Sequence, residues 1–188
     1  MPAPSSMPAH PSGVPARSSR VPENNPVTLR DARPDDWDAI WPFFHEIVAA
    51  GETYAYDPET DYEAGRSLWM IGPPGRTVVA TDAEGTVVGT SNMYANRPGR
   101  GSHVASASFM VDQSHAGRGT GRALGEEVIA WARRSGFRAI QFNAVVETNE
   151  RAVGLWRSLG FDVVGTVPEA FEHPDRGYVG LLIMHRFL

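Results

Sequence analysis

A run of alternating glycines constrains this chain more than any other feature of its sequence. The run lies between a strand predicted over 102–111 and a helix predicted to end at Gly136. Its residues are Gly117, Arg118, Gly119, Thr120, Gly121 and Arg122. Glycines let a backbone approach a ligand closely, and the free N–H groups and dipole of a helix start favour an anion. The pattern therefore predicts binding of a phosphate or pyrophosphate group, with a ligand-free glycine turn as the alternative.

Two common phosphate-binding motifs do not fit this run. The dinucleotide pattern G-x-G-x-x-G requires a glycine where Arg122 stands. The Walker sequence requires a lysine, and all 17 basic residues of the chain are arginines. The missing lysine also excludes Schiff-base chemistry. The sequence thus favours a phosphate ligand of another class.

Composition excludes several further classes of function. The formal charge of −5 argues against a nucleic-acid partner, which a basic excess would indicate. The chain contains no cysteine, so it can form no disulfide, thiolate metal site or cysteinyl acyl-enzyme. No apolar run approaches the roughly 20 residues that cross a bilayer. We expect a cytoplasmic protein with no membrane partner.

The chain divides into a tail and one domain. Residues 1–26 hold seven of the 15 prolines and many serines, which predicts a flexible tail. Residues 27–188 are long enough for one domain with a core of its own. Strands and helices are predicted in the order β-α-α-β-β-β-α-β-α-β-β. This order predicts an α/β fold in which helices cover both faces of a mixed, largely antiparallel sheet.

Three predicted elements bear on the functional site. A helix is predicted over 59–70, after a loop that begins at Glu52. The strand over 138–146 alternates, with Ile140, Phe142, Ala144 and Val146 expected on its core face. A helix is predicted over 148–159, where Asn149 suits the N-cap position and Gly160 suits the C-terminal stop.

Two segments resemble motifs of the GCN5-related N-acetyltransferase (GNAT) superfamily. The run 111–124 is similar to its motif A, Q/R-x-x-G-x-G/A, and the segment 149–161 is similar to its motif B, N-x-x-A-x-x-x-Y-x-x-x-G-F. Two positions depart from these patterns. Ala116 stands where motif A has Gln or Arg, and Trp156 stands where motif B has the tyrosine that often protonates the leaving thiolate. The resemblance covers residues 27–188.

The resemblance implies an acetyl-CoA-dependent N-acetyltransferase with a splay between its two central strands. By this resemblance acetyl-CoA is the co-substrate, no metal takes part, and the acetyl group passes directly to an amine in a ternary complex. Backbone amides from Arg118 to Arg122 would hold the pyrophosphate, and the strand end would pair with pantetheine. The implied cofactor contacts are Phe109, Met110, Val111, Gly117, Arg118, Gly119, Thr120, Gly121, Arg122, Asn149 and Trp156.

The acceptor side is suggested by two narrower resemblances. The loop with Tyr54 resembles the pocket wall of phosphinothricin-type acetyltransferases, and Asn143 and Asn149 resemble paired asparagines of azetidine-2-carboxylate (proline-analogue) acetyltransferases. These imply a small amine, an amino acid or an analogue, bound near Tyr54, Phe109 and Asn143. Asn143, Asn149 and Glu52 are the expected catalytic residues, because an amide can bind an amine and a carboxylate can accept its proton.

Several alternatives stay open at this point. Glu147, His103 and Asp112 are other candidates for the general base. Because Trp156 replaces the motif B tyrosine, a non-catalytic acyl-CoA sensor on the same scaffold is a rival interpretation. A protein N-terminus, a lysine or an aminoglycoside is a rival acceptor. Homodimers are common in families of this kind, so a homodimer is a further expectation.

Overall fold

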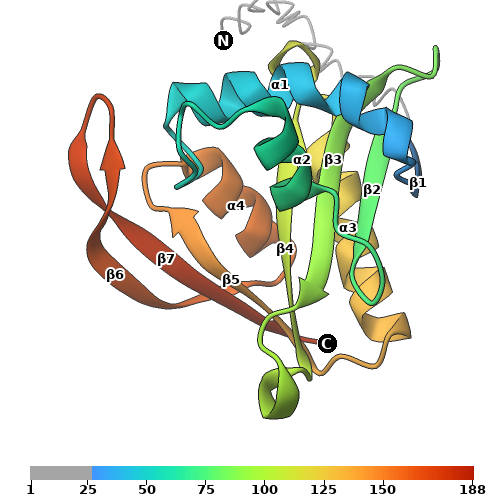
Figure 1. Cartoon of the computed structure of the whole chain (residues 1–188). Helices are drawn as coiled ribbons and strands as arrows, with labels where there is room; N and C mark the ends of the chain where they lie inside the picture. Colours follow the sequence, from blue (N-terminus) through green and yellow to red (C-terminus); the bar gives the residue numbers. More distant parts are fainter. Residues whose placement is uncertain (1–26) are drawn as a thin grey trace, which may run out of the picture.

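The computed structural model describes residues 27–188, which form one seven-stranded mixed sheet with helices on both faces (Figure 1). The strands are β1 (Thr28–Asp31), β2 (Arg76–Thr81), β3 (Val87–Ala95), β4 (Val104–Val111), β5 (Ala139–Val146), β6 (Asp162–His173) and β7 (Gly177–Phe187). The helices are α1 (Trp37–Ala50), α2 (Tyr62–Trp69), α3 (Thr120–Arg134) and α4 (Glu150–Ser158), with short 3-10 turns at Pro34–Asp36, Gly99–Gly101 and Gln113–His115.

The sheet has the strand order β1-β2-β3-β4-β5-β7-β6. Every neighbouring pair is antiparallel except β4 and β5, which run parallel. The element order and the largely antiparallel sheet confirm the predicted fold. The tail predicted over 1–26 lies outside the described residues.

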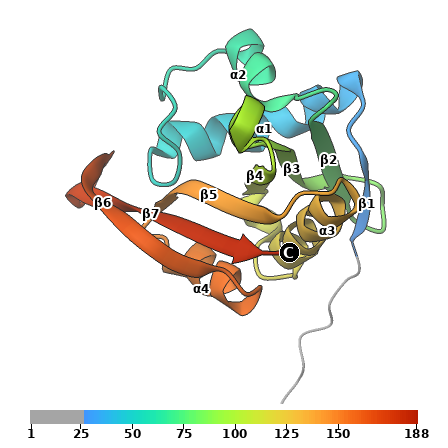
Figure 2. The same ribbon diagram turned by 90° about the horizontal axis from the view of Figure 1, so that it is seen from below.

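Different helices pack against the two faces of the sheet (Figure 2). On one face α3 and α4 pack against the strands through an apolar core that includes Leu124, Val128 and Trp156. On the other face α1 and α2 pack through an aromatic cluster that includes Trp37, Phe44 and Trp69. Because each helix carries its apolar residues on one stripe, each layer buries that stripe against the sheet.

The parallel strands β4 and β5 are joined only at one end. Val104 pairs with Ala139 and Ala105 with Ile140, and no further pair joins the two strands. Beyond Ala105 they diverge, which leaves the last six residues of β4 without a strand partner on that edge. The structure thus confirms the splay between the two central strands.

The first helical layer is tied to the sheet by Asp36. Its carboxylate accepts hydrogen bonds at 2.6 and 2.7 Å from the Arg30 guanidinium of β1 and one at 2.6 Å from the Arg33 N–H. Hydrogen bonding from Arg30 lowers the pKa of Asp36 in spite of partial burial. At the other end, α1 stops at Gly51, whose φ of 66° is left-handed. Asp36 thus anchors the start of α1, and a left-handed glycine ends it.

A β-bulge interrupts the alternation that the sequence predicts along β5. The register with β7 shifts between Phe142 and Val145, so the faces exchange at this point. Ala144 is exposed, although strict alternation places it in the core. Val145 packs against the α3/α4 core, and Val146 lies on the opposite side with Phe171. A period of two cannot reveal a bulge, which is the reason for the error.

Helix α2 begins three residues later than predicted. The predicted residues 59–61 form a turn instead, in which the Asp57 side chain accepts from the Glu59 N–H at 2.9 Å. Asp61 then caps the helix, since its carboxylate accepts from the Ala64 N–H at 2.9 Å. Within residues 27–188, none of the helices combines the length and apolarity needed to cross a membrane.

Candidate functional site

The glycine loop before α3 contains two residues with a left-handed backbone. Gly117 and Gly119 have φ values of 83° and 89°, which lie in the left-handed region. L-residues with side chains rarely adopt this region, so both positions require glycine. The loop therefore turns sharply and leaves its backbone exposed at the end of β4.

The start of α3 differs from the starts of α2 and α4. Those two helices begin with Asp61 and Asn149, whose side-chain oxygens accept from a backbone N–H of the first turn. The N-cap of α3 is Gly119, which has no side-chain oxygen to offer. The first intrahelical bond is donated by the Ala123 N–H to Gly119 O at 3.0 Å, so the amides before it are free for a ligand.

These free amides fit an anionic group such as a pyrophosphate. They belong to a 15-residue helix, whose dipole also favours negative charge at this end. A side chain at Gly121 would lie in van der Waals range of Leu155, which limits the room beside the loop. Thr120 is buried, and its Oγ1 has no hydrogen-bond partner among the described residues. Donors to an anion thus come from the backbone.

Three arginines surround this loop, and one of them was not predicted. The guanidinium of Arg122 donates to Ser158 Oγ at 2.8 Å and lies 3.6 Å from Glu126, so its side chain is engaged along the helices. Arg118 is exposed. The Arg151 Nη2 lies 3.9 Å from the position of a Cβ at Gly117. Arg151 therefore adds positive charge at the loop from α4, a contact that no local pattern indicates.

The register of β4 shows which of its backbone groups face the splay. The Asp112 N–H donates to Val88 O on β3 at 3.1 Å, and Gly89 pairs with Val111. In an antiparallel ladder this places Met110 in a hydrogen-bonded pair and Val111 and Phe109 in non-bonded pairs. The N–H and C=O groups of Phe109 and Val111 consequently point away from β3, toward the open edge.

Tyr54 reaches this open edge from the loop between α1 and α2. Its hydroxyl accepts from the Phe109 N–H at 3.0 Å and donates to the Phe109 C=O at 2.6 Å. The ring stacks on Tyr56, with centroids 5.4 Å apart, and meets Trp69 edge to face. Burial raises the pKa of the Tyr54 hydroxyl well above its ordinary value. The structure thus brings Tyr54 and Phe109 together, two residues predicted to bind substrate.

Trp156 fills the opposite side of the splay. Its ring lies 4.5 Å from that of Phe109 and 4.9 Å from that of Phe142, and only 6% of the residue is exposed. The three rings pack where β4 and β5 have separated. Trp156 is therefore a core residue that packs against the Phe109 ring, and little of the Trp156 surface is available for direct contact with a cofactor.

Asn143 belongs to a chain of side-chain amides on the α1/α2 face. It accepts from Gln141 Nε2 at 2.8 Å and donates from Nδ2 to Asn96 Oδ1 at 2.6 Å. These hydrogen-bonded amides connect β5 with the end of β3 at the base of the splay. Asn149 is elsewhere, as the N-cap of α4, where its Oδ1 accepts from the Ala152 N–H at 3.0 Å. No hydrogen bond of the described residues joins the two asparagines.

The four candidate bases have different surroundings. The carboxylate of Glu147 accepts from the Gly180 N–H at 2.5 Å and ties β5 to β7. Partial burial tends to raise the pKa of Asp112, but hydrogen bonds from Ser114 and His115 lower it overall. A low pKa weakens this carboxylate as a base. His103 lies one residue before β4, about 20 Å from Phe109 along the strand.

Glu52 is the candidate that the structure leaves free. It is exposed in the loop that carries Tyr54, two residues away from it. Its carboxylate takes part in no hydrogen bond or ion pair among the described residues. A free carboxylate on the loop that reaches the open edge of β4 suits the role of proton acceptor.

The β6–β7 hairpin bounds the same region. Its turn lies against the end of α1, since Pro174 Cδ is 3.9 Å from the position of a Cβ at Gly51 (Figure 1). A small buried cluster of Val146, Phe171 and Val179 supports the hairpin. The α1–α2 loop and the hairpin therefore enclose the α1/α2 side of the splay.

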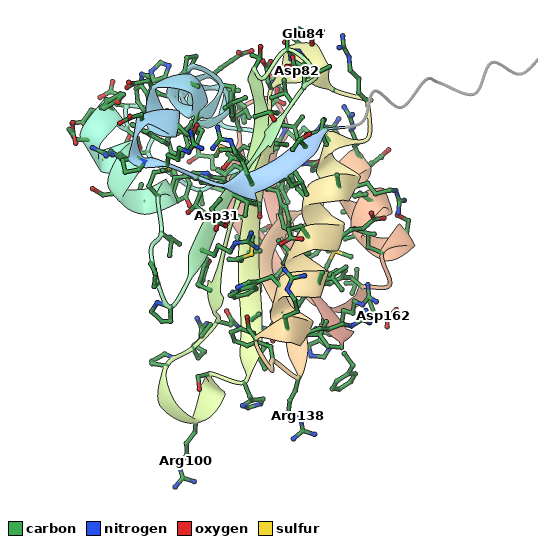
Figure 3. All side chains as sticks on the ribbon, turned by 90° about the vertical axis from the view of Figure 1, so that its right-hand side faces the viewer. Asp31, Asp82, Glu84, Arg100, Arg138 and Asp162 are labelled. Atoms are coloured by element: carbon green, nitrogen blue, oxygen red, sulfur yellow. The ribbon has the colours of Figure 1, made fainter. Side chains whose placement is uncertain are left out.

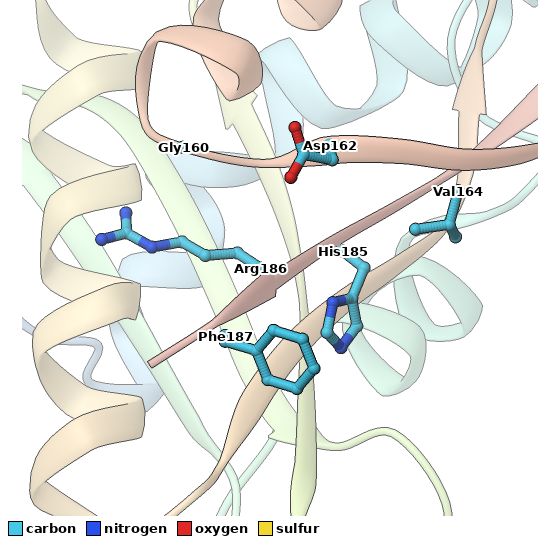
Figure 4. Close-up of a pocket in the computed structure, with 6 residues that line it drawn as sticks. All are labelled: Gly160, Asp162, Val164, His185, Arg186 and Phe187. Carbon is cyan, nitrogen blue, oxygen red and sulfur yellow. The ribbon is translucent and has the colours of Figure 1, made fainter.

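Other parts of the surface show less chemistry. A surface hollow on β6 and β7 is lined by Gly160, Asp162, Val164, His185, Arg186 and Phe187 (Figure 4). Arg186 there donates to Leu159 O, so its guanidinium serves the chain itself. Arg100 and Arg138 lie at the end of the molecule opposite Asp82 and Glu84 (Figure 3). Within the described part of the chain, no three His, Cys, Asp or Glu side chains gather as a metal site would require.

Comparison with known proteins supplies a family and several relatives. The family model described as "Acetyltransferase (GNAT) family" matches residues 38–161. N-acetyltransferase aca1 of Schizosaccharomyces pombe is 33% identical over 111 residues, 58% of this chain and 53% of that protein. The chain thus spans about half the length of that relative. The L-methionine sulfoximine/L-methionine sulfone acetyltransferase of Pseudomonas aeruginosa is 31% identical over 150 residues, 76% of this chain and 84% of that protein.

Two solved structures are similar over most of the chain. A GCN5-related N-acetyltransferase from Kribbella flavida is 67% identical with a TM-score of 0.84, covering 86% of this chain and 98% of that one. A phosphinothricin acetyltransferase from Sinorhizobium meliloti, solved with acetyl-CoA, is 27% identical with a TM-score of 0.76, covering 86% of this chain and 88% of that one.

Proposed function

This chain belongs to the acetyltransferase (GNAT) family, and we propose that it transfers acetyl directly to the amine of a small amino acid or amino-acid analogue. Family membership and the relatives establish the general reaction, in which acetyl-CoA donates its acetyl group to an amine. The observation that carries the narrower proposal is the open edge of β4. It lies between a glycine loop on one side and an enclosed polar surface on the other.

Acetyl-CoA would lie along this open edge. The free N–H groups at the start of α3 would hold its pyrophosphate, assisted by Arg118 and Arg151. The backbone of Val111, which faces the splay, would pair with the pantetheine amide. The thioester would then reach Phe109, at the level of Tyr54.

The acceptor would enter from the α1/α2 face. There Asn143 and Gln141 present amide groups, and the loop around Tyr54 and the β6–β7 turn limit the available space. Such a site suits a compact polar molecule. Among residues 27–188, no group of three or more acidic side chains gathers to receive a polycation such as an aminoglycoside. The Pseudomonas relative named for L-methionine sulfoximine and L-methionine sulfone supports an amino-acid analogue as the acceptor.

Direct transfer needs one proton acceptor and a leaving thiolate. Glu52 would take the proton of the attacking amine, either directly or through a water molecule. The amine, in its neutral form, would add to the thioester carbon while both substrates are bound, and its nitrogen would lose that proton to Glu52 as the amide forms. Coenzyme A leaves as a thiolate whose pKa is near 8.5, the ordinary value for a thiol, so it needs little assistance. This agrees with the indole of Trp156, which cannot act as an acid at this position.

Thiol release against a panel of amines tests this proposal. The panel contains L-methionine sulfone, phosphinothricin, azetidine-2-carboxylate, a polyamine, an aminoglycoside and a short peptide. We expect acetyl-CoA-dependent turnover confined to the amino-acid analogues, and none with a Gly119→Trp variant. Turnover of the peptide alone would contradict the small-molecule acceptor. Binding of acetyl-CoA without turnover of any amine would favour the sensor interpretation, which the absence of tyrosine at position 156 supports.

A further inference from the structure

The hydroxyl of Tyr54 occupies a position that a carbonyl oxygen could also occupy. It bonds to the N–H and the C=O of one residue, Phe109, at 3.0 and 2.6 Å. Both groups lie on the edge of β4 that has lost its strand partner. An N–H on such an edge is a strong donor that requires an acceptor. The Tyr54 hydroxyl is that acceptor here.

We propose that Tyr54 is a catalytic residue, whose hydroxyl donates to the carbonyl oxygen of the thioester and shares it with the Phe109 N–H. This inference rests on the proposed function, because it assumes that the thioester lies along β4. When the carbonyl oxygen takes the place of the hydroxyl as acceptor, the hydroxyl moves aside by about 3 Å, one hydrogen-bond length. Its proton turns from Phe109 O to the new oxygen.

Three features of Tyr54 suit this role. Burial raises its pKa, so the phenol stays protonated and can donate at neutral pH. The ring packs against Tyr56 and Trp69, which keep the hydroxyl close to the open edge of β4 when it moves. On the other side of the splay, Trp156 packs against the Phe109 ring and carries no hydroxyl. Tyr54 therefore supplies, from the α1/α2 face, the hydroxyl that α4 lacks.

Tyr54 donates a hydrogen bond in this step and keeps its proton. The amine nitrogen forms a bond to the carbonyl carbon, and the π electrons move to the oxygen. The Phe109 N–H and the Tyr54 O–H stabilise this oxyanion, which is the largest contribution in many acyl transfers. The oxyanion then re-forms the carbonyl as the C–S bond breaks, the thiolate leaves, and Glu52 holds the amine proton.

A Tyr54→Phe variant separates this role from packing, because it removes only the oxygen. For the panel amine that the wild type turns over fastest, we expect kcat to fall about 100-fold or more, as on removal of one oxyanion donor. The dissociation constant of acetyl-CoA, measured by calorimetry, should stay within about threefold. A Tyr62→Phe variant is the control. It removes a hydroxyl that bonds to Asp38 on the far part of the same helical layer, and it should keep wild-type kcat.

Infrared spectroscopy of bound acetyl-CoA, labelled with ¹³C at the carbonyl, provides a second readout that needs no acceptor. Hydrogen bonds weaken a C=O bond, so the band should lie at higher wavenumber in the Tyr54→Phe variant than in the wild type or Tyr62→Phe. An unchanged band together with kcat within twofold of the wild type would overturn the inference. A faster Tyr54→Phe variant with tighter acetyl-CoA binding would also overturn it, since the hydroxyl would then only block the site.

The two measurements distinguish failure of this inference from failure of the proposed function. If the wild type binds acetyl-CoA but acetylates no amine, the proposed function fails. The infrared shift then still decides whether Tyr54 contacts the thioester. If the wild type acetylates an amine and Tyr54→Phe does so equally well with an unchanged band, only the role of Tyr54 fails.

Discussion

The two sides of the splay between β4 and β5 are built from different parts of the chain. The glycine loop uses consecutive residues, Gly117 to Arg122, and presents backbone N–H groups. The proposed acceptor side uses side chains from separate segments, among them Tyr54 on the α1–α2 loop and Asn143 on β5. A backbone site made by a local turn tolerates change in the side chains around it. A side-chain site can change its specificity while the fold remains.

Substitution of Gly119 should give the largest effect and tests the backbone side. With φ at 89°, a Gly119→Trp variant is strained, and its side chain covers the free amides of α3. We expect acetyl-CoA affinity, measured by calorimetry, to fall more than about 100-fold, or at least 2.7 kcal/mol. Gly85→Trp is the matched control, because Gly85 has a φ of 85° in the β2–β3 turn. Equal losses in both variants would mean that strain, and not the loop, accounts for the effect.

Substitution of Glu52 tests the side-chain side. A Glu52→Gln variant should lose about 100-fold in kcat at pH 7, since general-base assistance is worth at least this much. Acetyl-CoA affinity should stay unchanged, because we place Glu52 on the proposed acceptor side. Glu59→Gln, an exposed acid in the same loop, is the control and should retain activity. Full activity of Glu52→Gln would assign proton removal to water or to another residue.

Arg151 sharpens the comparison by adding a side chain to the backbone site. Its guanidinium lies beside Gly117 and is exposed, so its contribution to the proposed phosphate binding should be modest. We expect Arg151→Gln to weaken acetyl-CoA binding about fivefold, in line with about 1 kcal/mol for an exposed ion pair. The difference from the wild type should shrink at high salt. Arg157→Gln, on the same helix, should bind acetyl-CoA normally.

The smallest functional effect is expected at Asp36, which only anchors the α1/α2 layer. Arg30 lowers the pKa of Asp36, so its contribution to stability is present above pH 4 and is lost as the pH falls through the folded-state pKa. Asp36→Asn should lower the free energy of unfolding by about 1–2 kcal/mol at pH 7 and change kcat little. Denaturation of the wild type and variant at pH 7 and pH 3 should show that the gap narrows in acid. A gap that persists in acid would contradict the ion pair as its cause.

The difference between the two sides also decides what the sequence could predict. Glycines 117–121 predicted a glycine loop followed by the start of α3, because these depend on neighbouring residues. The sequence also placed Asn149 as an N-cap and predicted the splay through the resemblance. It did not predict that Tyr54 bonds to Phe109, because 55 positions separate them. The position of Arg151 and the bulge before Val145 likewise depend on tertiary packing.

The central claim is that acetyl-CoA and the amine bind on opposite sides of one open strand edge at the same time. Initial velocities measured while both acetyl-CoA and the preferred panel amine are varied test it most directly. Reciprocal plots should intersect if transfer occurs within a ternary complex, as proposed. Parallel lines, together with a burst of thiol release before any amine is added, would indicate a covalent acetyl-enzyme and would contradict it.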